Sequence, residues 1–458
     1  MSNLTSEEPV DLATKAQDDE ETKAPILPQT RFGNDEDGVH QTCVVRSRSN
    51  DERAKAQRAA QLSIFVLFGC FGFMYITYLG RLVHIRELLG GESGPIDPRA
   101  ASFLLLGSSL GSVVAAPIAG AVIDNFSIRK FIRITATLSG IFLVLLSVFA
   151  TAGQYYLCVL DTIILGAMFS SFNIGINIAG VTVEGKSGGK TLMPKFHAFF
   201  QVGAVLAAWF STLIIAVDFT YIAQCLIVAL IALVISNWRI FSVYKIAKQA
   251  QVYTDGFEVE VSTSFKGKMK AKGLDLMVIM IGLMVLSSSL MEGSGNDWIS
   301  GGIVEGFDSP ESTGLVGMWV YLATTAAMRF FGTPLLDKFG RWKVMRVLFL
   351  LAFAGISLYI FSPTEPLAVF GCVLWGLGVS FGYPVGITAA AESGKNSSFR
   401  ASIVASIGNI MNIAGPPVIG LLANDLGIRL ALCVLLPFAI LGFGVSHWLW
   451  HKNITSPK

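Results

Sequence analysis

Twelve long apolar windows recur along the chain after residue 58, and this feature restricts the fold more than any other. A helix that crosses a membrane needs about 20 mostly apolar residues, and the windows have about this length. Composition agrees, because only 14% of the 458 residues are charged, whereas soluble globular chains carry about 25%. We predict an all-α integral membrane protein whose twelve spans lie at residues 59–82, 100–123, 131–152, 155–181, 196–217, 219–241, 274–298, 313–335, 344–361, 367–391, 401–422 and 428–450.

Lysine and arginine cluster on one side of this topology, before the first span and after the even-numbered ones. Short cytoplasmic loops are enriched in these residues, so we predict that both termini are cytoplasmic in a multi-pass protein of the cell membrane, plasma or inner. Residues 1–58 have too few apolar side chains to bury a core, and we predict a disordered tail there. The predicted domains are six-helix bundles at residues 59–241 and 274–451, a cytoplasmic loop at 242–273 and a tail at 452–458.

The two halves of the chain share loop motifs. The segment "IDNFSIRK" (123–130) follows the second span, and "LDKFGRWK" (336–343) follows the eighth. Glu184 after the fourth span and Glu392 after the tenth also hold corresponding positions. Duplicated halves are typical of secondary transporters, so we predict two pseudo-symmetric bundles in parallel.

These loops resemble the signature G-x-x-x-D-x-x-G-R-[KR]-x-x-[KR] that the major facilitator superfamily carries between its second and third helices. Gly120, Asp124, Arg129 and Lys130 carry the resemblance in the first half, with Asp337, Gly340, Arg341 and Lys343 in the second, while Ser127 replaces the usual glycine. We predict a cytoplasmic gate whose ion pairs break when the halves move apart, formed by Asp124, Arg129, Lys130, Glu184, Asp337, Arg341 and Glu392. The alternative is that these are ordinary charges of cytoplasmic loops.

Further segments resemble a bacterial MosC-like branch of that superfamily, to which fucose permeases are more distantly similar. They include "GRLVHIRELLG", "FNIGINIAGVTVE", "MPKFHAFFQVG", "EGSGNDW" and "GPPVIG". The resemblance implies a transporter and leaves its substrate open. Asn173 stands where that branch often has Asp, which casts doubt on a proton pathway carried over from it.

The segment "LMEGSGNDWIS" (290–300) places two carboxylates, Glu292 and Asp297, near the end of an apolar run. Ionisable groups inside a span are costly, so each is a functional hypothesis. The two lie about 140° apart on an ideal helix, and Glu292 lies about 27 Å from residue 274, close to the outer face. We predict that the helix loosens at its two glycines and that Glu292, Asn296 and Asp297 meet a polar ligand or a proton. Alternatively, the span ends near Leu290 and the segment is an outer lip.

Two pairs of polar residues recur at helical spacing. Asn173 and Asn177 share one face of the fourth span, where they can bind a hydroxylated ligand or join helices. His197 and Gln201 repeat the spacing in the fifth span. His197 can carry a proton or can be a solvated residue at the helix end.

Two arginines complete the candidate site residues. Arg329 lies inside the eighth span, where it can pair with Glu392 or Asp337 or bind an anionic group. Arg81 lies at the outer end of the first span. Either side chain can instead reach toward the membrane surface.

We therefore predict a monomeric secondary transporter that moves a small polar solute, sugar-like or polyol-like, by alternating access. Proton coupling is expected through Glu292 or Asp297, with His197 as the reserve. The sequence has no nucleotide-binding loop, no nucleophile with a base and no metal-ligand spacing, so we expect no cofactor, no bound metal and no enzyme activity. A net charge of +2 is too small to suggest nucleic acid. The alternatives are an exporter of amphiphilic compounds and a membrane sensor that does not transport.

Overall fold

The computed structural model describes residues 38–125, 127–185, 192–250, 276–393 and 397–450. The predicted tails and inter-bundle loop therefore lie partly outside the described residues, at 1–37, 251–275 and 451–458. The chain divides into one unit over residues 1–53 and a second over residues 54–458. All contacts below belong to the second unit.

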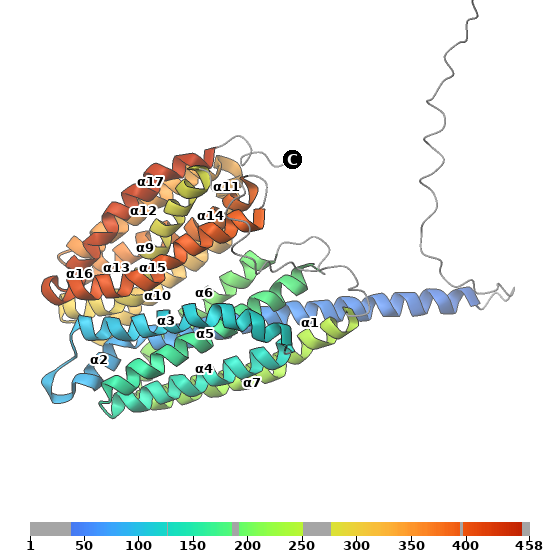
Figure 1. Ribbon diagram of the computed structural model, residues 1–458, viewed down its shortest axis with the longest axis horizontal. Helices are drawn as coiled ribbons and strands as arrows, with labels where there is room; N and C mark the ends of the chain where they lie inside the picture. The colour runs from blue at the N-terminus through green and yellow to red at the C-terminus, as the bar shows by residue number, and fades with distance from the viewer. Residues whose placement is uncertain (1–37, 126, 186–191, 251–275, 394–396, 451–458) are drawn as a thin grey trace, which may run out of the picture. The chain divides into compact units, whose positions relative to one another are not determined.

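Seven α-helices form the N-terminal bundle (Figure 1). They are α1 (Gly38–Gly80), α2 (Leu82–Gly90), α3 (Pro98–Asn125), α4 (Ile128–Thr151), α5 (Tyr155–Gly185), α6 (Met193–Ala216) and α7 (Tyr221–Ala250). The short α2 and a 3-10 turn at Gly91–Ser93 connect α1 to α3. The other six helices are long enough to cross a membrane.

The C-terminal bundle repeats this arrangement with more interruptions. Its helices are α9 (Leu276–Phe307), α10 (Glu311–Phe331), α11 (Thr333–Phe339), α12 (Arg341–Phe361), α13 (Glu365–Val379), α14 (Gly382–Glu392), α15 (Ser397–Leu426), α16 (Ile428–Ala431) and α17 (Leu435–Val445). Over the described residues the structure has twelve segments long and apolar enough to span a membrane, and no strand, as predicted.

Several helices are longer than the sequence predicted. Residues 38–58, predicted as tail, are the first turns of α1, and residues 242–250, predicted as loop, are the last turns of α7. Both segments are rich in good helix formers such as Ala, Arg, Lys and Gln. Because the segments are polar, a search for apolar windows does not detect them. Helix α9 also continues to Phe307, nine residues past the predicted end of that span.

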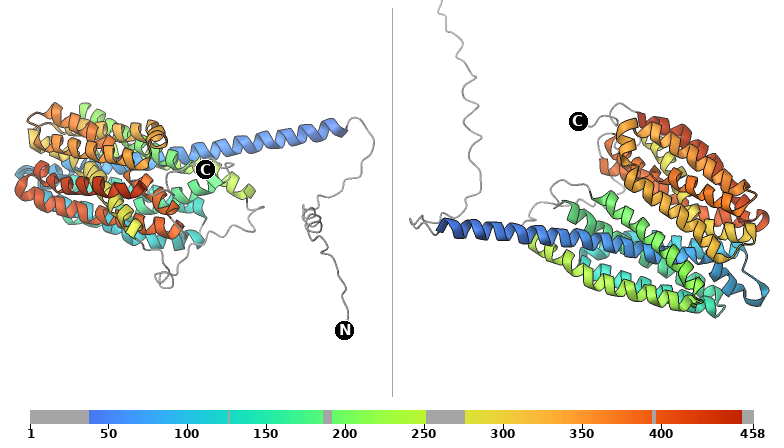
Figure 2. Two further views of the ribbon diagram at one scale, coloured as in Figure 1. Left: turned by 90° about the horizontal axis from the view of Figure 1, so that it is seen from above. Right: turned by 180° about the vertical axis from the view of Figure 1, so that it is seen from behind.

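Small residues let helices approach closely within the N-terminal bundle. A Cβ added at Gly166 of α5 would overlap the carbonyl of Ser108 in α3, and one at Gly111 of α3 would overlap the carbonyl of Ile163 in α5. In a membrane, where helices cannot gain stability by hiding apolar surface from water, this close backbone packing is a main source of helix association. Helices α3 and α5 contact each other extensively (Figure 1), and Figure 2 gives two further views of the bundles.

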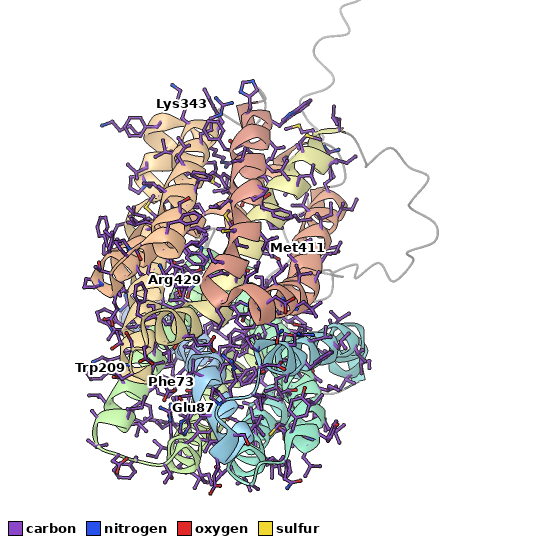
Figure 3. The ribbon with its side chains drawn as sticks, turned by 90° about the vertical axis from the view of Figure 1, so that its left-hand side faces the viewer. Phe73, Glu87, Trp209, Lys343, Met411 and Arg429 are labelled. Atoms are coloured by element: carbon purple, nitrogen blue, oxygen red, sulfur yellow. The ribbon has the colours of Figure 1, made fainter. Side chains whose placement is uncertain are left out.

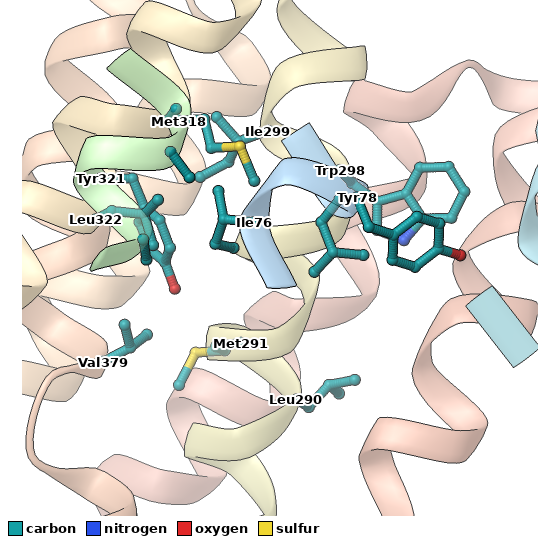
Figure 4. Close-up of a cluster of buried hydrophobic side chains, with 14 of the residues drawn as sticks. Ile76, Tyr78, Leu290, Met291, Trp298, Ile299, Met318, Tyr321, Leu322 and Val379 are labelled. Atoms are coloured by element: carbon teal, nitrogen blue, oxygen red, sulfur yellow. The ribbon is translucent and has the colours of Figure 1, made fainter. Parts of the chain in front are cut away.

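The contacts between the two bundles include those of α6 with α10, of α3 with α15 and of α2 with α9. Side chains of α1, α9 and α10 pack together beside these contacts (Figure 4). Trp298 and Tyr321 are each 1% exposed and Met291 is fully buried there. Helix α9 therefore lies against the other bundle, and its polar residues face the bundle interface or its own neighbours.

The duplicated loops differ in backbone conformation. We call the helix ends near residues 123–130, 336–343 and 392–397 the basic end of the bundles, and the ends near residues 81–98 and 305–311 the opposite end. At the basic end, Gly340 has φ 83°, a left-handed conformation that suits glycine. Ser127, its counterpart in the first half, has φ −59°. The replacement of glycine by Ser127 therefore costs no backbone strain, because that turn takes a different path.

Candidate functional site

A cavity of about 500 Å³ lies between the bundles and is lined by both. Its wall is mixed: aromatic rings come from α1, α5, α6 and α14, and hydroxyl, amide and carboxyl groups come from α3, α5, α9 and α15. The lining includes Tyr75, Tyr78, Ser108, Ser109, Ser112, Phe169, Asn173, His197, Phe200, Glu292, Ser294, Asn296, Asp297, Tyr383 and Asn409. Such a combination of rings and hydrogen-bonding groups suits a small polar solute.

The central wall of the cavity is α9, which is helical throughout its length. The predicted loosening at its glycines is wrong, and so is the alternative that the span ends near Leu290. Gly295 serves close packing instead, since a Cβ there would lie 2.6 Å from the Tyr321 ring. Because α9 continues to Phe307, Glu292 lies in the middle of the helix and not near the outer face as predicted.

Glu292 forms an ion pair inside the C-terminal bundle. Its Oε1 lies 2.7 Å from the Nη2 atom of Arg329 on α10, and the two side chains are only 18% and 15% exposed. The prediction that Arg329 pairs with Glu392 or Asp337 is wrong. The hydropathy pattern gives no depth for a side chain, and Arg329 reaches from near the end of α10 toward the centre of α9.

A helix break in the tenth span fixes the orientation of Arg329. The span is interrupted between α13 and α14 at Ser380 and Phe381. Pro384 lacks an N–H and cannot donate to the carbonyl of Ser380, four residues earlier. That carbonyl accepts instead from Nε of Arg329, at 2.7 Å. The sequence "GVSFGYPVG" contained this signal, and the broken helix lies here and not in α9.

Asp297 and Asn296 line the same cavity as Glu292. On the continuous helix α9, Glu292 and Asp297 lie about 140° apart around the helix axis. The cavity extends far enough around α9 for both side chains to line it. Asp297 forms no ion pair with any residue that the structure describes. The buried Oδ1 atom of Asn296 has no hydrogen-bond partner within the described ranges. Both groups are therefore available to a ligand.

The predicted amide pairs have different roles. Asn177 donates from Nδ2 to Oδ1 of Asn173 at 2.7 Å, so the shared face is confirmed and only Asn173 lines the cavity. Gln201 is 3% exposed and donates from Nε2 to Oε1 of Glu292 at 3.4 Å. This hydrogen bond joins α6 to α9 and extends the Glu292–Arg329 pair across the bundle interface.

His197 lines the cavity from the second turn of α6, where its side chain is exposed, so both predicted roles stay open. Its ring meets Phe68 edge-on, with ring centroids 5.1 Å apart. The structure thus brings six of the predicted residues together around one space: Asn173, His197, Glu292, Asn296 and Asp297 in the wall, and Gln201 behind it.

Asp161 of α5 is an ionisable residue that the sequence reasoning missed. It is 3% exposed, and neither carboxyl oxygen has a hydrogen-bond partner in the described part of the chain. The signal was visible, because Asp161 interrupts the apolar run "YYLCVLDTIILG". It lies outside the cavity wall, so we assign it no part in binding the solute.

Ion pairs connect the bundles at the opposite end. Arg81, between α1 and α2, lies 3.2 Å from Glu311 at the start of α10, and these side chains are 2% and 12% exposed. Arg86 of α2 forms a second pair with Glu305 of α9. A third pair, more exposed, joins α3 to α15. Figure 3 shows Glu87, a neighbour of this network, on α2. Arg81 is therefore a buried partner in an inter-bundle contact rather than a residue that reaches for the membrane surface.

The predicted gate residues at the basic end make local contacts. Arg341 of α12 pairs with Glu392 of α14 at 2.5 Å, within the C-terminal bundle. Glu184 accepts hydrogen bonds from the backbone N–H groups of Leu192 and Met193 and so caps the start of α6. The exposed Asp337 and Lys130 lie at the same end. The side chain of Asp124 is outside the described residues, and the gate role, Arg129 included, stays a prediction.

Comparison with known proteins identifies relatives across most of the chain. Residues 275–458 match the model of the Major Facilitator Superfamily. An uncharacterised transporter of Sinorhizobium fredii is 28% identical over 348 residues, which are 74% of this chain and 85% of the relative. An uncharacterised MFS-type transporter of Yersinia pestis is 25% identical over 332 residues, 72% of this chain and 81% of the relative.

Solved structures share the fold at low sequence identity. The nucleoside transporter NupG matches with a TM-score of 0.61 at 16% identity, over 86% of this chain and 100% of NupG. A D-xylose-proton symporter matches with a TM-score of 0.62 at 13% identity, over 86% and 97% of the two chains. The transporter FucP, in an outward conformation, has a TM-score of 0.52 at 15% identity, over 86% and 100%. This chain therefore has the fold of the major facilitator superfamily, with twelve spans in two bundles, its residues 275–458 match that family's model, and its relatives are transporters and not enzymes.

Proposed function

We propose that the chain is a secondary transporter that carries a small polar solute, sugar-like or polyol-like, across the cell membrane by alternating access. The observation that supports it most is the cavity between the bundles, in which amide, hydroxyl and carboxyl groups face aromatic rings. Aromatic faces accommodate the C–H surface of a sugar-like solute, and the polar groups can bind its hydroxyls. The chain acts as a monomer in this proposal, because one chain contributes the whole wall.

The three polar residues of α9, Glu292, Asn296 and Asp297, have different roles in this proposal. Glu292 and Arg329 compensate each other's charge and offer hydrogen-bond acceptors and donors to the solute. Asn296 adds an amide with a free acceptor. Asp297, which has no ion-pair partner in the described ranges, is the group that gains and loses the coupling proton. His197 remains the reserve, since it faces the same cavity.

The positions of the ion pairs support an inward-facing state. Arg81–Glu311 and Arg86–Glu305 hold the bundles together at the opposite end, whereas the Arg341–Glu392 pair at the basic end stays within one bundle. If the basic end is cytoplasmic, as the distribution of Lys and Arg indicates, the cavity is closed to the outside. Transport then requires these inter-bundle pairs to break and the basic end to close.

The test begins with thermal unfolding of the purified protein in the presence of sugars, polyols, nucleosides, amines and carboxylates. A ligand at 100 times its dissociation constant should add about 2.7 kcal/mol to the free energy of unfolding. Ligands found this way are then supplied, radiolabelled, to proteoliposomes with and without an inward proton gradient. Accumulation of a polyol or sugar that needs the gradient supports the proposal. Stabilisation by apolar cations alone would point to an exporter of amphiphiles instead.

A further inference from the structure

A cluster of three metal-ligand side chains lies at the opposite end, away from the cavity. The geometry points to a binding site for a zinc-like divalent cation formed by His84 and Glu87 of α2 and Glu311 of α10, which holds the two bundles together when it is filled. This inference rests on the proposed function only for its effect on transport. Whether the ion binds is a separate matter.

The ligand atoms are already close to the spacing that zinc requires. His84 Nδ1 lies 3.3 Å from Glu87 Oε2 and 3.8 Å from Glu311 Oε2, and all three ligand atoms fall within 4.8 Å of one another. Zinc binds nitrogen and oxygen at about 2.0–2.2 Å with tetrahedral geometry, which puts neighbouring ligand atoms roughly 3.3 Å apart. Only the Glu311 carboxylate has to move nearer, and a water molecule can take the fourth position.

Two of the ligands are prearranged by their own helix. His84 and Glu87 stand three residues apart on α2, which places their side chains on one face. The hydrogen bond from His84 is the main reason that the pKa of Glu87 is lowered from its ordinary value, with smaller contributions from the charges of His84, Arg81 and Arg86, while partial burial opposes them. With 48% of its side chain exposed, Glu87 is open to an entering ion.

Arg81 competes for the third ligand. Its Nη1 atom lies 3.2 Å from the same Glu311 oxygen, so the arginine and the ion must share this carboxylate. The other oxygen, Oε1, is buried and has no hydrogen-bond partner among the described residues, so it can accept from Arg81 when Oε2 turns to the ion. The positive charge of Arg81 weakens the binding of any cation at this site. The His84 imidazole is a nitrogen ligand, and it favours zinc over Mg²⁺ or Ca²⁺ because those ions prefer six or more oxygen ligands.

The ligands come from both bundles, which gives the ion a mechanical consequence. Two belong to α2 and one to α10, and the site is complete only while the bundles are in contact at the opposite end. An ion that binds one conformation better than the other shifts the population toward it. Zinc should therefore stabilise this state and slow every transport cycle that requires the opposite end to open.

The first experiment measures zinc binding to the purified full-length protein by competition with a chromophoric chelator. We expect one zinc ion to bind per chain in the wild type and at least about tenfold weaker binding in His84→Ala and in Glu87→Gln. Glu92→Gln is the matched control, since Glu92 is an exposed carboxylate on the same connection and lies outside the cluster. Wild-type affinity in both ligand variants would overturn the site. Glu87 is half exposed, so its variant tests the site even if the histidine variant fails to fold.

The second experiment measures transport in proteoliposomes with zinc added on the side of the opposite end. Zinc should slow the wild type and Glu92→Gln and should leave His84→Ala unaffected. Zinc that binds as expected but does not change the rate would overturn the bridging role. A protein that binds zinc and transports none of the solutes tested would count against the proposed function and leave the site intact.

Discussion

The centre of the bundle interface and its opposite end both contain buried ion pairs, but these pairs connect different parts of the molecule. Glu292–Arg329 joins α9 to α10 within one bundle, whereas Arg81–Glu311 joins the α1–α2 turn to α10 in the other bundle. A pair within a bundle can persist while the bundles rock, and a pair between bundles must break. In the proposed transport cycle, the first therefore serves recognition of a solute, and the second helps to set the balance between conformations.

The largest effect is expected at the centre, from Glu292→Gln. The substitution leaves Arg329 buried without its carboxylate and removes a charged hydrogen-bond group worth about 1.5–3 kcal/mol, so solute binding should weaken roughly 10- to 100-fold. Loss of a partner from a buried pair also costs about 3–5 kcal/mol of stability. Isothermal titration and thermal unfolding measure the two quantities.

A double variant, Glu292→Gln with Arg329→Gln, separates recognition from folding. It removes both charges, so stability should recover relative to the single variant while solute binding stays weak. Solute binding restored to the wild-type level in the double variant would show that the pair has only a structural role.

The next largest effect concerns the other carboxylate of α9. Asp297→Asn removes the proposed proton carrier and keeps its size, so uptake driven by a proton gradient should be lost while exchange of labelled for unlabelled solute continues. Asp218→Asn is the matched control, because Asp218 is exposed in the turn between α6 and α7. Gradient-driven accumulation by Asp297→Asn would remove this residue from the coupling mechanism.

The smallest effect is expected at the basic end, from Arg341→Gln. The Arg341–Glu392 pair is partly exposed, at 26% and 41%, and lies within one bundle. Exposed pairs contribute about 0–1 kcal/mol, so the melting temperature should barely change. If these residues form a gate, the transport rate should fall several-fold at unchanged solute affinity. An unchanged rate would leave them as ordinary loop charges.

Hydropathy was enough to predict the twelve spans, because their length and apolar composition depend on the bilayer, and the shared loop motifs were enough to predict the duplication. They could not assign partners. Glu292 and Arg329 are far apart in sequence, and their meeting depends on helix rotation and depth, which an apolar pattern does not specify. The glycines of α9 were interpreted as flexible, although Gly295 is required for contact with Tyr321. In contrast, Pro384 and Asp161 gave readable signals that the prediction did not use.

We propose that the inter-bundle ion pairs hold the opposite end closed. Spin-label distances test this proposal most directly, with one pair of labels at residues 92 and 364 at the opposite end and a second pair at residues 195 and 338 at the basic end. Arg81→Gln leaves Glu311 buried and unpaired only while that end is closed, so the equilibrium should shift toward the open form by at least about tenfold. We predict longer distances at the opposite end and shorter ones at the basic end. Unchanged distance distributions at both ends in Arg81→Gln would contradict the account.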